Sequence, residues 1–423
     1  MRSLSKEAKA SWSLFIICWL VYAVISMTKS GFSSAIASMT QEHILNKADA
    51  GMINSFFYLF YGGAQLVFLK FIDKIKPTRL ITMALLGTLV SMIGMALSNS
   101  FLPMLILWSF CGLMQFSIWP AVLRLMSEYL LPEHEGVAHI AIAFSYCVGS
   151  LLNYLIAALV LGISRWPTLF WTFAVILVLI TVVWWTISAK TVPMLSALRT
   201  KACPATTSSE EEKGNRSIKL LPLMATTGLL FLTFTGFCRT ALDAGLKSWV
   251  PTMIVENYAS VSVSFANVLT TVLIGVNLTG AFIATWIYPK RVKSAVWSLA
   301  LCFAIAVPFM IVLLWTGSIP VALVVLALTV ITTMMYAGHQ LINVIIPSRF
   351  SKFGKEGSIC AILNAFASFG AVAASYLFGF LAENYGWNAT IVSWIVLAGI
   401  AVLLTALAAP LWKRFFRSKG EVL

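Results

Sequence analysis

Charged residues are scarce in this chain of 423 residues. Only 10% of the residues are Asp, Glu, Lys or Arg, whereas 60% are hydrophobic and the mean hydropathy is +0.91. A soluble protein carries about 25% charged residues, so this composition excludes a soluble enzyme. Aromatic residues make up 13% of the chain, which excludes a disordered or fibrous protein. Much of the surface must therefore face lipid.

Cysteine pairs with metal-ligand or redox spacing are also lacking. The chain has seven cysteines but no Cys-x-x-Cys and no cysteine spaced against a histidine as a metal site requires. Six of them lie in different apolar segments, namely Cys18, Cys111, Cys147, Cys238, Cys302 and Cys360. We interpret these as small buried hydrophobic residues, and we expect neither a metal nor a cofactor.

Long apolar runs dominate what is present, whereas the alternation of apolar and polar residues typical of a membrane β-barrel is missing. A helix needs about 20 apolar residues to cross the hydrocarbon layer. With this criterion the sequence predicts an all-α membrane protein of twelve transmembrane helices. The spans are predicted at roughly 12–39, 50–72, 79–98, 101–127, 137–161, 167–188, 220–250, 262–288, 293–316, 319–346, 356–382 and 387–412.

One long polar run divides the twelve spans into six and six. It lies within Lys190–Lys219 and includes the sequence Ser208-Ser209-Glu210-Glu211-Glu212-Lys213. We interpret residues 190–219 as a cytoplasmic linker between an N-terminal six-helix bundle, residues 1–189, and a C-terminal one, residues 220–423.

The distribution of Lys and Arg predicts the orientation, because cytoplasmic loops are enriched in these residues. Nearly all of them lie at the two ends of the chain and in the even-numbered loops, whereas the odd-numbered loops hold only Lys47, Arg165 and Lys247. Both termini are therefore expected in the cytoplasm. The net charge of +14 is explained by this bias and by attraction to anionic lipid, so no nucleic-acid partner is expected.

Landmarks recur in the two halves at a nearly constant spacing. The pairs are Lys29 with Arg239, Gly63 with Gly280, and Trp166 with Trp387. Two parallel six-helix bundles related by an axis along the membrane normal would produce this pattern. Such folds bind their substrate near the midplane between the halves and work by rocking one bundle against the other.

Two cations, Lys29 and Arg239, lie inside predicted spans. A charge at the bilayer centre costs about 2.5–3.5 kcal/mol, so each needs a partner or a wet surrounding. An i,i+4 ion pair with Asp243 would explain Arg239 without any ligand. Lys29 has only Ser and Thr neighbours, and the alternative for this residue is snorkelling towards the outer interface.

If both cations face the substrate, they favour an anionic one. Arg offers a planar fork for phosphate or carboxylate, whereas Lys acts as a point charge. Coupling to protons would need an intramembrane carboxylate or histidine, and the candidates are Asp243 and His339. Anion exchange would need neither.

Several motifs resemble a known family across essentially the whole chain. The fourth span reads Cys111-Gly112, Gln115, Trp119-Pro120 and Arg124; further motifs are Asp73-Lys74-Ile75-Lys76-Pro77, Trp249-Val250-Pro251-Thr252 after Arg239, and Gly379–Glu383 before Gly386-Trp387. These are similar to motifs of the major facilitator superfamily, and within it of the organophosphate:phosphate antiporters such as the glycerol-3-phosphate and hexose-phosphate transporters. Trp119-Pro120 is also expected to kink the fourth span.

The resemblance implies that one cation in the first span and one in the seventh bind the anion. Arg239 matches the second, whereas Lys29 stands one place along from the first. A family Lys in the second span is Gln65 here, a family His in the fifth span is Tyr146, and Tyr61 keeps an aromatic position near the substrate. The resemblance therefore implies an anion carrier more firmly than it implies which anion.

The predicted site residues follow from these two lines of reasoning. For substrate binding they are Lys29, Arg239, Tyr22, Tyr61, Gln65, Trp119, Tyr146 and Asn364; for coupling or ion pairing they are Asp243 and His339; for a cytoplasmic gating loop they are Asp73, Lys74 and Arg79.

The leading hypothesis is a secondary active transporter, not an enzyme, that moves a small phosphorylated or carboxylated metabolite by alternating access as an anion exchanger. One alternative is a cation-coupled symporter of a carboxylate or sugar acid, and a second is a non-transporting sugar-phosphate sensor. The expected partners are the anionic substrate and membrane lipid. We expect a monomer in a plasma membrane, with the bacterial inner membrane favoured.

Overall fold

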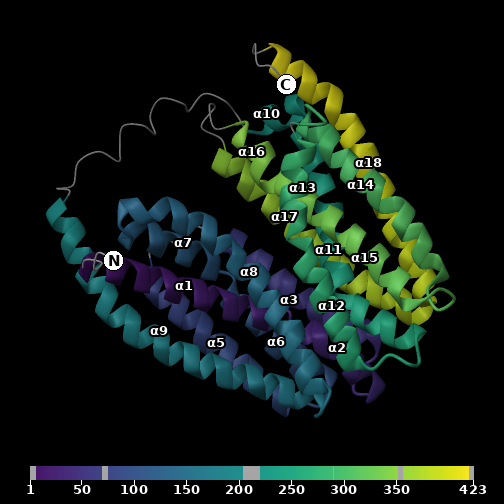
Figure 1. Cartoon of the computed structure of the whole chain (residues 1–423), viewed down its shortest axis with the longest axis horizontal. Helices are drawn as coiled ribbons and strands as arrows, with labels where there is room; N and C mark the ends of the chain where they lie inside the picture. Colours follow the sequence, from purple (N-terminus) through teal and green to yellow (C-terminus); the bar gives the residue numbers. More distant parts are fainter. Residues whose placement is uncertain (1–5, 69–74, 203–219, 289, 351–355, 419–423) are drawn as a thin grey trace. The chain divides into compact units, whose positions relative to one another are not determined.

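Helices make up all the regular structure that is described. The computed structural model describes residues 6–68, 75–202, 220–288, 290–350 and 356–418 (Figure 1). No strand occurs within these ranges, and 11 helical segments within them are long and apolar enough to cross a membrane. The prediction of an all-α membrane protein is confirmed.

The elements follow the predicted spans closely. The first six spans correspond to α1 (Lys6–Lys29) with α2 (Gly31–Gln41), α3 (Lys47–Val67), α5 (Pro77–Leu97), α6 (Phe101–Gln115) with α7 (Ile118–Tyr129), α8 (Pro132–Leu161) and α9 (Trp166–Ala202). The second six correspond to α10 (Leu220–Thr227) with α11 (Leu229–Asn257), α12 (Val263–Asn277) with α13 (Thr279–Ile287), α14 (Ala295–Val312) with η2 (Leu313–Trp315), α15 (Val321–Gln340) with η3 (Leu341–Ile345) and α16 (Ile346–Ser348), α17 (Glu356–Asn384) and α18 (Gly386–Ser418).

The second predicted span, 50–72, is the one without a counterpart among the 11 apolar segments. It forms α3, a helix of 21 residues whose sequence includes Asn54, Ser55 and Gln65. These polar side chains lower the hydropathy of α3. A helix with this composition is expected to pack against protein on most of its surface.

The chain forms two compact units. Unit 1 is Met1–Ile44 with Leu59–Ser208, and unit 2 is Leu45–Tyr58 with Ser209–Leu423. The boundary passes through α3, so the first half of this helix packs with unit 2 and the second half with unit 1.

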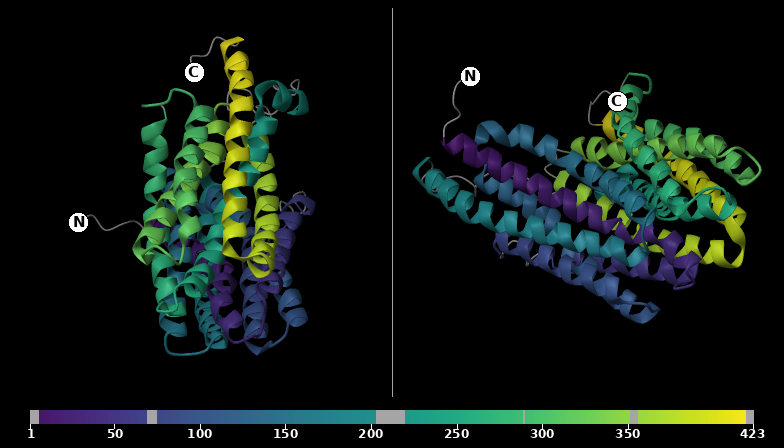
Figure 2. Two further views of the ribbon diagram at one scale, coloured as in Figure 1. Left: turned by 90° about the vertical axis from the view of Figure 1, so that its right-hand side faces the viewer. Right: turned by 60° about the horizontal axis from the view of Figure 1, so that its bottom comes forward.

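Unit 1 is built around α1. This helix packs against α8 and α9, and α5 packs against α6 and α9. Figure 2 (right) shows the purple α1 lying alongside the teal α9. Bulky side chains fill the contacts between these helices, with Trp108, Trp166 and Phe170 fully buried.

Unit 2 is built around α11 and α14. The former packs against α17 and α18, and the latter against α15 and α18. The yellow α18 lies alongside the green α14 in Figure 1. Hydroxyl side chains inside these helices bond back to their own helix, as Thr233 Oγ1 does to Leu229 O at 2.8 Å, which satisfies polar groups where water is absent.

Helix ends and breaks have local causes. Pro77 and Pro132 each begin a helix, where the missing N–H costs nothing. Gly386, the first residue of α18, has a φ of 79°, a left-handed conformation that glycine adopts without strain and that turns the chain after α17. The tenth predicted span changes to π-helix at η3, and such turns are frequent at functional sites.

The structure differs from the sequence predictions at three places. Helix α9 runs to Ala202, so the first part of the segment interpreted as linker is helical, and residues 203–219 of that segment lie outside the described residues. Lys47 and Lys247, which were expected in loops, lie in helices: Lys47 begins α3, and Lys247 lies inside α11. Both positions make ion pairs that the loop placement did not suggest.

Candidate functional site

A row of three charges lies along one side of α11. Arg239, Asp243 and Lys247 follow one another at i,i+4 spacing, which places their side chains on the same stripe of the helix. Lys247 Nζ lies 2.8 Å from Asp243 Oδ1 and 2.9 Å from Oδ2. Arg239 Nη1 lies 3.9 Å from Oδ2. The three side chains together carry one net positive charge.

Arg239 is the most deeply buried member of this row. Its residue surface is only 4% exposed, and its Nη2 donates to Thr240 Oγ1 at 2.5 Å. Its stem packs on Gly338 of α15, where an added Cβ would lie 3.6 Å from Arg239 Cδ and 3.3 Å from Leu299 Cδ1. A Cβ at this position would make an ordinary contact with the arginine and a tight one with Leu299. The predicted pair of Arg239 with Asp243 is present, but the carboxylate is closer to Lys247.

His339 follows Gly338 at the end of α15. Its Nδ1 lies 2.7 Å from Asn343 Nδ2 in η3, and because an amide nitrogen can only donate, the ring accepts at Nδ1. The imidazole interacts electrostatically with Arg239, Asp243 and Lys247. The two predicted coupling residues, Asp243 and His339, are therefore brought into one cluster with Arg239.

The second membrane cation lies against an aromatic ring in unit 1. Lys29 is the last residue of α1, and its Nζ lies 3.9 Å from the centroid of the Tyr61 ring. The carbonyl end of a helix favours a cation, and so does the face of an aromatic ring. Both side chains are half-buried.

Other predicted aromatic residues lie in the same unit. Tyr22 of α1 and Trp119 of α7 have ring centroids 4.7 Å apart. Tyr146 lies half-buried on α8, a helix that packs against α1. Trp119 and Pro120 stand at the start of α7, directly after the break between α6 and α7, so the helix is interrupted where the sequence predicts a kink.

Gln65 has a partner that explains its residue type. Its Nε2 donates to Phe116 O at 3.3 Å. In an unbroken helix the N–H of residue 120 would donate to this carbonyl, but Pro120 has no N–H. Gln65 therefore supplies the hydrogen bond that Pro120 removes, and it links α3 to the α6–α7 break.

Gln115 is a polar residue of unit 1 that the site prediction did not include. Fully buried, it directs Nε2 towards Thr28 Oγ1 at 3.2 Å, Thr88 Oγ1 at 3.3 Å and Cys111 Sγ at 3.4 Å. It thus joins α1, α5 and α6 next to Lys29. The spacing of Cys111 and Gln115 in the fourth span is the feature of the sequence from which this bridge could have been predicted.

The remaining predicted residues are exposed or lie outside the described residues. Asn364 lies on α17, with its Nδ2 3.5 Å from Cys360 Sγ, and Cys360 Sγ lies 3.6 Å from the backbone oxygen of Asn343, the partner of His339. Arg79 is exposed in the first turn of α5. Asp73 and Lys74 lie outside the described residues.

Comparison with known proteins identifies the family. A profile of the Major Facilitator Superfamily matches residues 18–355. The chain belongs to the Major Facilitator Superfamily. Members of this superfamily are multi-pass membrane transporters for small molecules rather than enzymes, and the resemblance inferred from the motifs is confirmed.

Individual relatives of this superfamily transporter share low identity with it. A probable hexose phosphate transport protein of Chlamydia pneumoniae is 22% identical over 418 residues, covering 92% of this chain and 89% of its own. The membrane sensor protein UhpC of Salmonella typhimurium is 25% identical over 123 residues, which is 29% of this chain and 28% of the sensor. A bacterial homologue of the human lysosomal transporter Spinster shares the fold, with a TM-score of 0.78, 14% identity, and coverage of 97% of this chain and 99% of its own.

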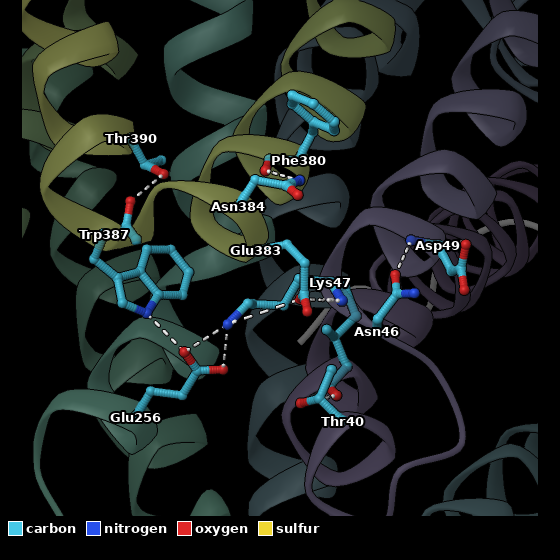
Figure 3. A network of polar contacts seen from close by, with 12 residues as sticks. Thr40, Asn46, Lys47, Asp49, Glu256, Phe380, Glu383, Asn384, Trp387 and Thr390 are labelled. Carbon is cyan, nitrogen blue, oxygen red and sulfur yellow. Dashed lines mark hydrogen bonds and ion pairs between the residues drawn. The ribbon is translucent and has the colours of Figure 1, made fainter.

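A second polar cluster of this superfamily member surrounds Lys47 in unit 2 (Figure 3). Lys47 Nζ donates to Glu256 of α11 at 3.0 and 3.2 Å and lies 3.9 Å from Glu383 of α17. The Lys47 backbone N–H donates to Glu383 Oε2 at 3.0 Å, so this carboxylate caps the start of α3. Trp387 Nε1 donates to Glu256 Oε2 at 2.8 Å.

Close backbone packing continues this attachment along α3. A Cβ added at Gly51 would lie 2.5 Å from Ser375 O of α17, so only glycine fits. One turn further, Ser55 Oγ donates to Val372 O at 2.7 Å, and Asn54 Nδ2 donates to Ser248 Oγ at 3.1 Å. Ion pairs at the start of α3 and close contacts along its first half thus attach this part of the helix to the rest of unit 2.

Proposed function

We propose that this transporter moves a small organic anion across the bacterial inner membrane by alternating access, and that a phosphorylated sugar is the favoured substrate class. The observation that carries the proposal is Arg239, a guanidinium that is 4% exposed inside α11 within a cluster of net positive charge. Buried cations are rare in membrane-spanning helices, and they mark substrate or ion sites. Its planar fork matches phosphate and carboxylate oxygens.

The substrate class is supported by the relatives as well. The Chlamydia protein that aligns over 92% of this chain is named as a probable hexose phosphate transport protein. A sugar phosphate carries the negative charge that Arg239 would bind and a hydroxylated ring that can stack on aromatic side chains. The low identity of 22% leaves room for a different anion, which is the reason to test several classes.

In this proposal unit 1 contributes Lys29 to the binding of the anion. The Tyr61 ring beneath Lys29 Nζ holds the ammonium at 3.9 Å without neutralising it. Tyr22, Trp119 and Tyr146 are proposed to contact the rest of the substrate. Gln65 and Asn364 are proposed to contact it through their amides, Gln65 in addition to its bond with Phe116.

Anion exchange is the proposed mode, with both termini in the cytoplasm and the protein acting as a monomer. The charge bias of the loops supports this orientation. The cluster of Asp243 with His339 favours one alternative, a cation-coupled symporter of a carboxylate or sugar acid, because these side chains could carry a proton. The partial match to a Salmonella membrane sensor supports a second, a sensor that binds a sugar phosphate without moving it.

The first experiment is thermal unfolding of the purified protein in detergent against a panel of anions: inorganic phosphate, glucose 6-phosphate, a phosphonate, glucuronate and a dicarboxylate. A ligand at 100 times its dissociation constant stabilises the folded state by about 2.7 kcal/mol. A shift with glucose 6-phosphate and inorganic phosphate supports the exchanger. A shift with glucuronate alone supports the carboxylate symporter, and no shift with any anion contradicts the proposal.

Proteoliposomes distinguish the modes of action. Exchange requires an anion on the inside and no pH gradient, whereas a symporter accumulates its substrate when a pH gradient is imposed. Asp243→Asn should leave exchange dependent only on the inside anion, and should abolish the response to a pH gradient if Asp243 carries the proton. Ligand binding with no counterflow at all would favour the sensor.

A further inference from the structure

We propose that Lys247 sets the affinity of the anion site by holding the charge of Asp243, so that the cluster around Arg239 keeps one net positive charge. This inference rests on the proposed function, because it assigns a role to a residue of the same anion site. Lys247 acts through Asp243 and is a positioning residue, not one that contacts the substrate.

The distances assign Asp243 to Lys247. Asp243 Oδ2 accepts a hydrogen bond from Lys247 Nζ at 2.9 Å, and Oδ1 lies 2.8 Å from the same nitrogen as an ion pair. The guanidinium of Arg239 lies 3.9 Å from the nearer oxygen, beyond the 2.7–2.9 Å of a charge-assisted hydrogen bond. Arg239 instead directs Nη2 to Thr240 Oγ1 at 2.5 Å. Asp243 is therefore bonded to Lys247 and only a longer-range neighbour of Arg239.

This arrangement decides what charge an incoming anion meets. Without Lys247, Asp243 and Arg239 would sum to zero, and the carboxylate could form the paired hydrogen bonds with the guanidinium that a substrate phosphate would otherwise make. The bound carboxylate and the substrate would then compete for the same fork. With Lys247 present, Asp243 has a partner on its far side, and the cluster attracts an anion.

The size of the effect follows from the helix geometry. Lys247 is two turns from Arg239, about 12 Å along the axis. Removing one unit charge at this distance changes the affinity for a monovalent anion by roughly tenfold at an effective dielectric of 20. His339 interacts with all three charges, and it is the same in every variant below, so it does not alter the comparison.

The test compares the dissociation constants of five variants with that of the full-length wild type, in detergent, at one pH and low ionic strength. The probes are glucose 6-phosphate, inorganic phosphate and glucuronate, and the variant comparison uses whichever of these the wild type binds. The variants are Lys247→Gln, Lys247→Arg, Asp243→Asn, the double variant with Asp243→Asn and Lys247→Gln, and Lys293→Gln. Lys293 is an exposed lysine of the same unit, which controls for a general loss of positive charge.

The proposal predicts a definite order of affinities. Lys247→Gln should bind roughly tenfold more weakly, whereas Lys247→Arg and Lys293→Gln should bind like the wild type. The double variant should bind at least as tightly as the wild type, because its cluster again carries one net positive charge and the removed carboxylate lies closer to Arg239 than the removed ammonium does. Asp243→Asn alone should bind more tightly than the wild type.

Three results would overturn the inference. If Lys247→Gln binds as tightly as the wild type, the inference is wrong and the proposed function is unaffected. If the double variant binds roughly tenfold more weakly than the wild type, the inference is also wrong, because Lys247 then acts other than through Asp243. This comparison remains decisive even if Lys247→Gln alone does not fold. A wild type that binds none of the three probes removes the proposed function and this inference together.

Discussion

The hydrogen bond from Gln65 to Phe116 O leads to a prediction that can be tested as a thermodynamic cycle. Gln65→Ala removes the donor that lies 3.3 Å from this carbonyl, and Pro120 offers no N–H in its place. The half-buried carbonyl of Phe116 then loses this donor. The variant should therefore be less stable than the wild type.

The expected loss is modest. Leaving one buried hydrogen-bonding group without its partner costs about 1–3 kcal/mol, and side-chain hydrogen bonds inside membrane proteins average about 0.6 kcal/mol. We expect about 1 kcal/mol for Gln65→Ala. For a chain this long, that corresponds to roughly 1 °C in Tm, so a titration of the free energy of unfolding is the better measurement.

Pro120→Ala provides the matched background. It restores an N–H at position 120, which can donate to Phe116 O as in an ordinary helix. Gln65→Ala should therefore cost much less in the Pro120→Ala background than in the wild type. The coupling energy is read from the free energies of unfolding of the four proteins, titrated in mixed micelles.

The reasoning is refuted if Gln65→Ala costs the same in both backgrounds. The two residues would then be independent, and the contact of Gln65 with Phe116 would have no bearing on the missing N–H of Pro120.

Two further predictions concern α3 and its neighbours. Gly51→Ala should lower the free energy of unfolding by about 1–3 kcal/mol, because its Cβ would lie 2.5 Å from Ser375 O. Gly63→Ala in the same helix meets nothing within 4 Å and should stabilise the protein by up to about 1 kcal/mol through helix propensity. Equal effects of the two changes on the free energy of unfolding would contradict the packing at Gly51. Tyr61→Leu should weaken binding of glucose 6-phosphate and lower the melting temperature, with Tyr61→Phe close to the wild type, because the ring that faces Lys29 is worth about 0.5–2 kcal/mol. Identical behaviour of the Leu and Phe variants would show that the ring does not matter.

Sequence periodicity and composition were sufficient for the fold because lipid imposes long apolar helices. The membrane cations Lys29 and Arg239 could be found in the same way, since a charge within an apolar run is conspicuous. Helix α3 is the exception, because the predicted span 50–72 is shifted from the helix Lys47–Val67. Its polar residues make contacts with other helices, such as that of Ser55 with Val372 O.

The partners of the site residues were harder to predict. Asp243 was recognised as a partner of Arg239 from its spacing, but Lys247 has the same spacing on the other side of Asp243 and was taken for a loop residue. Counting i,i+4 neighbours in both directions would have found it. Other contacts join segments that are distant in sequence, such as Gln65 with Phe116 and Lys47 with Glu256. These contacts depend on how the helices pack, and the spacing of residues in one sequence does not show that packing.

The central claim is that Arg239 binds the anion, and the most direct measurement is uptake of labelled glucose 6-phosphate, inorganic phosphate and glucuronate by proteoliposomes that contain Arg239→Gln. Arg414→Gln, which changes an exposed arginine of α18, is the matched control. If Arg239 binds the anion, Arg239→Gln remains folded and loses uptake of every anion that the wild type transports, while Arg414→Gln transports normally. Normal uptake by folded Arg239→Gln would show that Arg239 does not bind the anion.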